Sequence, residues 1–128
     1  MRKTPQESGV TTTQTNDHMS ELNILTQSLI AFRNARDWEQ FHNPKDLAVA
    51  ISVEAGELLE QFLWKQPAEA NREKVKEEIA DILAYILLLA HHYGFDAAEI
   101  LKEKIAKNEL KYPVDKAKGN ARKYNEFD

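Results

Sequence analysis

The stretch VEAGELLEQFLW, residues 53–64, and the stretch EEIADILAYILLLA, residues 77–90, decide the fold of this chain. Apolar residues recur every three or four positions in the first stretch, which is the period of an α-helix, and the second stretch contains a continuous apolar run. Each stretch also carries two acids three positions apart: Glu54 and Glu57 in the first, Glu78 and Asp81 in the second. Residues at this spacing share one side of a helix, so each helix presents a pair of carboxylates beside apolar sequence.

Helix start and stop signals extend this pattern to the rest of the chain. Ser20, Asn43 and Asp96 are good N-cap residues, and Pro44 fits the first position of a helix. Gly94 is a candidate left-handed C-cap residue. The sequence therefore predicts four helices with short connections, over residues 20–37, 44–65, 70–93 and 97–111.

Four connected helices indicate an all-α protein whose protomer is a four-helix bundle. The third helix is apolar on every side from Ile82 to Ala90, and such a helix is normally buried on every side. A chain of 128 residues has little further protein to surround it. We therefore expect a homo-oligomer, in which a second copy covers the exposed part of this helix.

The amino-acid composition of the chain excludes several classes of protein and of binding partner. The chain has no cysteine and a formal net charge of −4, which excludes disulfides and cysteine-bound zinc and gives no reason to expect polymeric nucleic acid as a partner. We find no signal peptide and no apolar run long enough for a bilayer, so we expect a cytoplasmic protein without a membrane partner. The expected organisation is a flexible tail over residues 1–19, a helical domain over 20–113 and a charged tail over 114–128.

The four carboxylates raise an electrostatic problem if the second and third helices pack antiparallel. Two ionised carboxylates ~5 Å apart repel by about 3 kcal/mol at an effective dielectric constant near 20. Cations bound between them would remove that repulsion, and Mg²⁺ is the usual hard cation where phosphates share the coordination. The alternative is that these are solvated helical acids, as most are. A ferritin-like di-iron site is disfavoured because the spacing from Glu39 to His42 has no second copy.

Aromatic and basic residues flank the carboxylates in the sequence. Trp38, His42 and Trp64 stand near the two ends of the second helix, and either form a stacking slot for a flat base or simply pack in the core. Tyr85 is open to the same two interpretations. The lysines of the fourth helix either form a solvated face or, in part, meet the charge of a triphosphate.

These motifs together resemble a known family. EAGE and EIAD, at residues 54–57 and 78–81, match the ExxE and ExxD motifs of the MazG-like all-α nucleoside triphosphate pyrophosphohydrolases. The DWEQFH segment, the FLW after the first acidic pair and the KYP motif are similar to the dCTP pyrophosphatase branch. The resemblance extends from Ser20 to about Tyr124.

The resemblance implies hydrolysis of a nucleoside triphosphate, with dCTP or a related pyrimidine nucleotide as substrate, to the monophosphate and pyrophosphate with Mg²⁺. It implies assembly as a dimer or as a tetramer of two dimers, often with a shared active site. It makes Glu54, Glu57, Glu78 and Asp81 metal ligands, and Glu54 or Glu57 would also activate the attacking water. The substrate-binding positions that it implies are Trp38, His42, Trp64, Tyr85, Lys107, Asn108, Lys111 and Tyr112.

An alternative of a different class is a helical oligomerisation or nucleotide-binding module without turnover. The sequence also leaves open the preferred base and sugar, the number of metal ions, the identity of the general base, and the choice between dimer and tetramer.

Overall fold

Three of the long helices begin after the N-cap residues that the sequence predicts. In this computed structural model, which describes residues 19–126, the Ser20 hydroxyl accepts a hydrogen bond from the Asn23 amide and opens α1, Glu21–Ala35. Asn43 caps α2, Pro44–Glu60, and Asp96 caps α4, Ala97–Lys111, in the same way. Of the tail predicted over residues 1–19, all but Met19 lies outside the described residues.

The third long helix, α3, covers Arg72–His92 and ends at a turn in which Gly94 has a φ of +71°, a left-handed conformation that glycine adopts at little cost. The remaining elements are the short helix α5, Val114–Ala117, and the 3-10 turns Glu39–Phe41, Pro67–Glu69 and Tyr124–Glu126. The described residues contain no strand, so the all-α prediction is confirmed.

One predicted boundary is wrong. The sequence places the end of the second helix near Lys65, before Pro67, but α2 ends at Glu60. The chain leaves the helix through tight turns in which the Phe62 amide donates to the Leu59 carbonyl and the Lys65 amide to the Phe62 carbonyl. Trp64 has a φ of +62° and breaks the helical path before the proline is reached.

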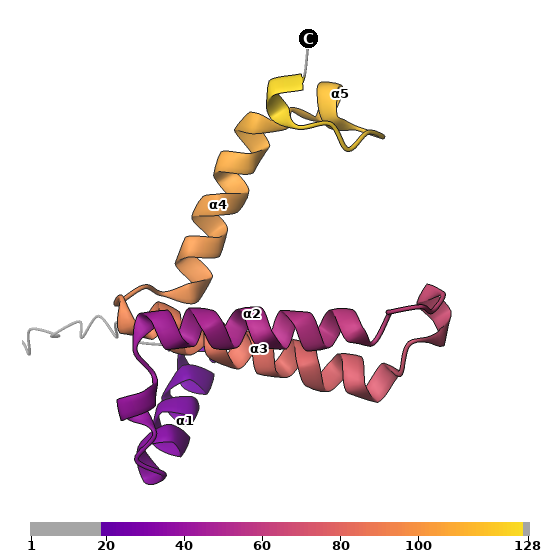
Figure 1. Cartoon of the computed structure of the whole chain (residues 1–128). Helices are drawn as coiled ribbons and strands as arrows, with labels where there is room; N and C mark the ends of the chain where they lie inside the picture. The colour runs from indigo at the N-terminus through magenta and orange to yellow at the C-terminus, as the bar shows by residue number, and fades with distance from the viewer. Residues whose placement is uncertain (1–18, 127–128) are drawn as a thin grey trace, which may run out of the picture.

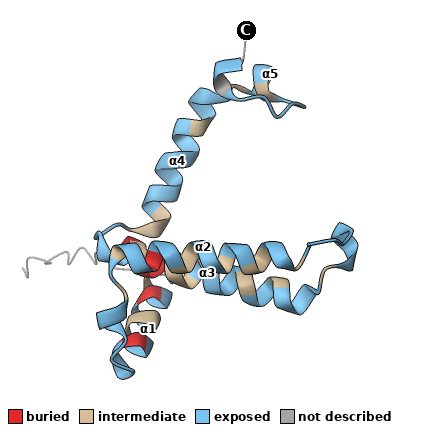
Figure 2. Cartoon of the chain, in the orientation of Figure 1, coloured by how far each residue is buried: buried red, intermediate tan, exposed pale blue. Residues whose placement is uncertain are grey.

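The α2 and α3 helices form an antiparallel hairpin, and α1 packs across the end of α3 (Figure 1). The buried side chains gather where these three helices meet (Figure 2). They are Leu47, Leu87, Leu88 and Ala90, together with the polar residues Thr26 and Arg33. This junction fixes the relative positions of α1, α2 and α3 and so determines which of their side chains meet.

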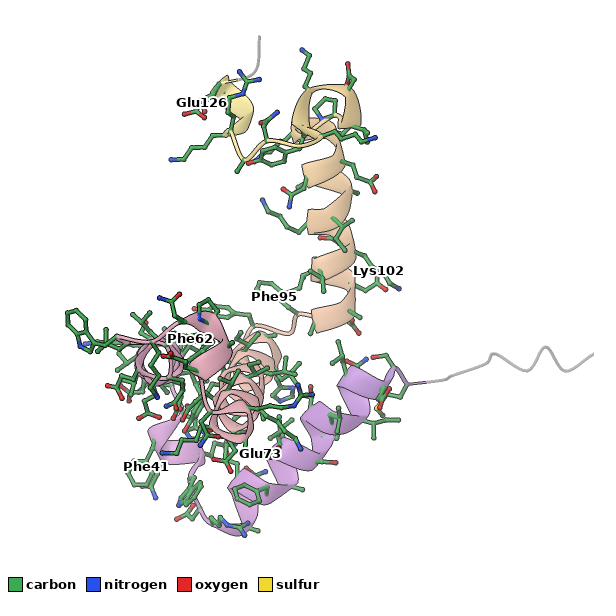
Figure 3. The ribbon with its side chains drawn as sticks, turned by 90° about the vertical axis from the view of Figure 1, so that its right-hand side faces the viewer. Phe41, Phe62, Glu73, Phe95, Lys102 and Glu126 are labelled. Atoms are coloured by element: carbon green, nitrogen blue, oxygen red, sulfur yellow. The ribbon has the colours of Figure 1, made fainter. Side chains whose placement is uncertain are left out.

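The α4 helix projects away from the α1–α3 junction, and within one copy the four long helices do not form a closed bundle (Figures 1 and 3). Its first residues stay near α1, where the Asn23 side-chain amide donates to Asp96 at 2.8 Å. None of the helices in the described part of the chain has the length and apolar character needed to cross a membrane.

Candidate active site

Three carboxylates meet where α2 lies beside α3. Oxygen atoms of Glu54, Glu78 and Asp81 all lie within 4.8 Å of one another. Glu54 and Glu78 are half-buried, and Asp81 is exposed at the edge of the cluster. Glu57, one helical turn after Glu54, is also half-buried but does not belong to this group of three. The hairpin thus brings acids from both sequence motifs to one place.

The carboxylates of this cluster repel one another. The pKa of Glu54 is raised from 4.5 to about 7. The largest cause is the contact of Glu54 with Glu78, followed by burial and by Glu57. One oxygen of Glu54 and one of Glu78 are buried and have no hydrogen-bond partner among the described residues. No lysine or arginine of residues 19–126 forms an ion pair with the cluster. The oxygens that remain unsatisfied are suitable ligands for a hard divalent cation.

A cavity of about 290 Å³ adjoins the carboxylates and shares Asp81 with them. Asp81, Tyr85 and Leu88 lie along one face of α3, as their spacing predicts, and all three line the cavity. The remaining residues that line the cavity come from α1, from the segment between α1 and α2, and from one further position of α3. They are Leu29, Phe32, Arg33, Trp38, His42 and Ala84. An aromatic space therefore opens directly beside the clustered acids.

Local structure holds the aromatic walls of this cavity in place. After α1 ends, Asp37 takes a φ of +54°, and the Trp38 amide donates back to the Arg33 carbonyl at 3.1 Å. The Trp38 ring packs edge-on against Phe32, with ring centroids 5.8 Å apart. His42 packs in the same manner against Tyr85, with centroids 6.2 Å apart.

The surroundings of His42 favour its uncharged form. Burial first, and then the positive charge of Arg33, lowers the pKa of the imidazole below its usual 6.5. Its Nδ1 atom is buried and has no hydrogen-bond partner among the described residues. A neutral imidazole with one unsatisfied nitrogen can donate or accept a hydrogen bond with a ligand in the cavity.

The structure does not bring every predicted site residue to this cavity. Trp64 is 95% exposed and follows the end of α2, whereas Trp38 precedes its start, and the helix between them is about 25 Å long. Four other predicted substrate-binding positions lie at the end of α4 and at its C-cap, and α4 projects away from α1, α2 and α3 (Figure 3). Within one copy, none of these residues lines the cavity: Trp64, Lys107, Asn108, Lys111 and Tyr112.

Sequence reasoning missed Arg33, which lines the cavity from α1 and is almost fully buried. A signal was present. Leu22, Thr26, Leu29 and Arg33 follow one another at intervals of three or four residues, so the arginine occupies a position of the stripe that faces the other helices. A charged residue on such a stripe indicates a paired or functional group.

The fold and the site define an all-α protein in which an antiparallel helix pair presents clustered carboxylates beside an aromatic cavity. Comparison with known proteins identifies the family to which the chain belongs. Residues 49–127 match the model of the MazG-like family. A pyrophosphatase from Archaeoglobus fulgidus has a similar structure, with a TM-score of 0.69 and 41% sequence identity over 75% of this chain and 95% of that one. The chain belongs to the MazG-like family.

Relatives with assigned names are also pyrophosphatases. The chain is 38% identical over 104 residues to dCTP pyrophosphatase 1 of Rattus norvegicus, and 37% identical over 104 residues to that of Homo sapiens. These alignments cover 75% of this chain but 61% of each relative. The chain therefore spans about three fifths of the length of the relatives it matches.

Proposed function

We propose that this protein is a Mg²⁺-dependent nucleoside triphosphate pyrophosphohydrolase that converts dCTP, or a related pyrimidine triphosphate, to the monophosphate and pyrophosphate. One observation carries the proposal: the carboxylate cluster and the aromatic cavity share Asp81. A nucleotide needs a flat apolar surface for its base and a cation site for its phosphates within one molecular length. Family membership and the pyrophosphatase relatives support the same chemistry.

The residues present fit a divalent cation. Glu54, Glu78 and Asp81 offer three oxygens within 4.8 Å of one another, and two buried carboxylate oxygens lack partners among the described residues. These three acids would hold the metal, and Glu57 adds a fourth carboxylate one turn away. When bound, Mg²⁺ offsets the negative charge of the triphosphate and lowers the pKa of a coordinated water.

The side chains of this chain have separate parts in the reaction. Water attacks the α-phosphorus, the bond from that phosphorus to the bridging oxygen breaks, and pyrophosphate leaves with the bond's electron pair. Glu57, which is near enough to Glu54 to raise its pKa, or Glu54 itself takes the proton from the attacking water. Trp38 and Tyr85 enclose the base, and the His42 imidazole hydrogen-bonds to it.

A second copy of the chain would complete the site and the bundle. Leu83 and Ile86 of α3 and Leu101 and Ile105 of α4 are all more than 40% exposed. Full burial of an exposed side chain of this size is worth ~1.5–3 kcal/mol, and covering the exposed half of each of these contributes roughly half of that. An α4 helix packed on a partner would cover these residues and carry the polar end of α4, from Lys107 to Tyr112, towards the carboxylates of the other copy. We propose a dimer, or a tetramer of two dimers, for this reason.

The test is product analysis with purified protein, dCTP and Mg²⁺. We expect equal amounts of dCMP and pyrophosphate, and we expect Asp81→Ala to abolish their release, because this residue belongs to both the acidic cluster and the cavity. Glu77→Ala, an exposed acid on the same helix, is the matched control and should keep its activity. Release of single phosphate, or full activity in Asp81→Ala, would contradict the proposal. Tight dCTP binding without any product would instead favour a non-catalytic nucleotide-binding module.

A further inference from the structure

Arg33 is a buried charge without a buried counter-charge. It stands in the last turn of α1 and is 8% exposed. Its Nε atom donates to the Asn34 side chain at 3.4 Å, which is a long and weak hydrogen bond. No carboxylate in residues 19–126 forms an ion pair with it. The two terminal nitrogens of Arg33 are not among the buried unpaired polar atoms of the described residues, so they are open to the cavities that Arg33 lines and can donate there to a ligand.

Two cavities meet at Arg33 and His42, and both residues line each of them. Arg33 lines the aromatic cavity beside the carboxylates, and it also lines a second cavity of about 390 Å³ whose walls include His91 and His92. The histidines close α3 about 15 Å along the helix from Asp81. Arg33 therefore lies towards the end of the aromatic cavity that is farther from the metal-binding acids.

The backbone of Arg33 holds the turn after α1, and this backbone role does not depend on the side chain. Its backbone carbonyl accepts hydrogen bonds from the amides of Arg36 and Trp38, at 3.2 and 3.1 Å, and any residue at this position supplies that carbonyl. A cation in the last turn of a helix is favourable, but an exposed one serves as well. Neither of these roles uses the terminal nitrogens that line the two cavities.

We infer that Arg33 is a specificity-determining residue that reads the edge of the nucleobase. The inference rests on the proposed function, because it takes the aromatic cavity as the base site. With the phosphates at Asp81, the base extends towards Arg33 between Trp38 and Tyr85. A guanidinium offers two parallel donors to two adjacent acceptors. The O2 and N3 atoms of cytosine supply that pair, whereas uracil and thymine place an N3–H donor against the guanidinium.

The experiment compares kcat/KM for dCTP and dUTP in the wild type, Arg33→Met and Arg33→Lys. We expect the preference for dCTP to fall about 10- to 100-fold in Arg33→Met, mainly through loss of dCTP turnover, and to fall substantially in Arg33→Lys, which keeps the charge but loses the two parallel donors. Arg72→Met, an exposed arginine at the start of α3, should leave the ratio unchanged. Equal losses on both substrates would mean that Arg33 acts only on folding and would overturn the inference.

A second measurement uses the unmodified protein and does not depend on turnover. In ¹⁵N-arginine NMR spectra, dCMP should shift the Arg33 guanidinium signals and dUMP should shift them much less. Equal responses to the two nucleotides, or none, would refute base reading by Arg33. A wild-type protein that hydrolyses no triphosphate would refute the proposed function, and the titration would still decide whether Arg33 contacts a cytosine base.

Discussion

Replacing Glu54 by glutamine tests the electrostatics of the carboxylate cluster directly. The pKa of Glu54 is raised from 4.5 to about 7, chiefly by the neighbouring Glu78 carboxylate. Because the folded state binds this proton more tightly than the unfolded chain does, the free energy of unfolding decreases as pH rises from about 4.5 through 7. Stability from this group is thus fully present below pH 4.5 and is lost above 7.

The size of the effect follows from the same shift. At about 1.4 kcal/mol per pKa unit, the difference between 4.5 and 7 corresponds to about 3 kcal/mol. Solvent screening reduces this because Asp81 is exposed at the edge of the cluster. We therefore expect a loss of roughly 1–2 kcal/mol, equivalent to about 4–10 °C in Tm for a chain of this size.

The assay is thermal unfolding from pH 4 to 8.5 in EDTA, repeated with Mg²⁺. In EDTA, the wild type should lose stability as pH rises, and Glu54→Gln should lose about 4–10 °C less over the same range. Mg²⁺ should restore the wild type above pH 7 and stabilise Glu54→Gln much less. Glu60→Gln, an exposed acid on α2 outside the cluster, should behave like the wild type. Parallel pH profiles for the wild type and Glu54→Gln would refute the reasoning.

Three further predictions concern other parts of the molecule. Trp38→Ala should raise KM for dCTP by about 5- to 100-fold with a smaller change in kcat, since base–aromatic stacking is worth ~1–3 kcal/mol; a kcat loss alone would contradict this. Leu101→Glu, which places a charge on the apolar side of α4, should shift the protein to a smaller assembly in analytical ultracentrifugation, and an unchanged mass would argue against a partner on that side. Gly94→Ala should destabilise the chain by ~1 kcal/mol in denaturant unfolding because φ is +71°, although nothing lies within 4 Å of the added carbon. A neutral or stabilising result there would mean that the turn after α3 can change its conformation.

The prediction from sequence was most accurate where structure is local. The N-caps at Ser20, Asn43 and Asp96 are confirmed because a cap depends on three or four consecutive residues. The predicted end of α2 is wrong because Pro67 marks the last position at which the helix could stop, whereas the chain already turns at residues 61–65. Leu83 and Ile86 of the apolar stretch of α3 are exposed in one copy, and the second copy that the sequence predicts to cover them stays a prediction.

The sequence by itself determined the helices, the family and the two acidic motifs, because periodicity, capping and motif spacing depend only on residues close together in the chain. The tertiary structure decided which side chains meet. It clustered Glu54 with Glu78 and Asp81, placed Trp38 but not Trp64 at the cavity, and buried Arg33 beside it. These outcomes depend on how α1 crosses the α2–α3 hairpin and on where α4 projects, and such angles come from packing between residues distant in the sequence.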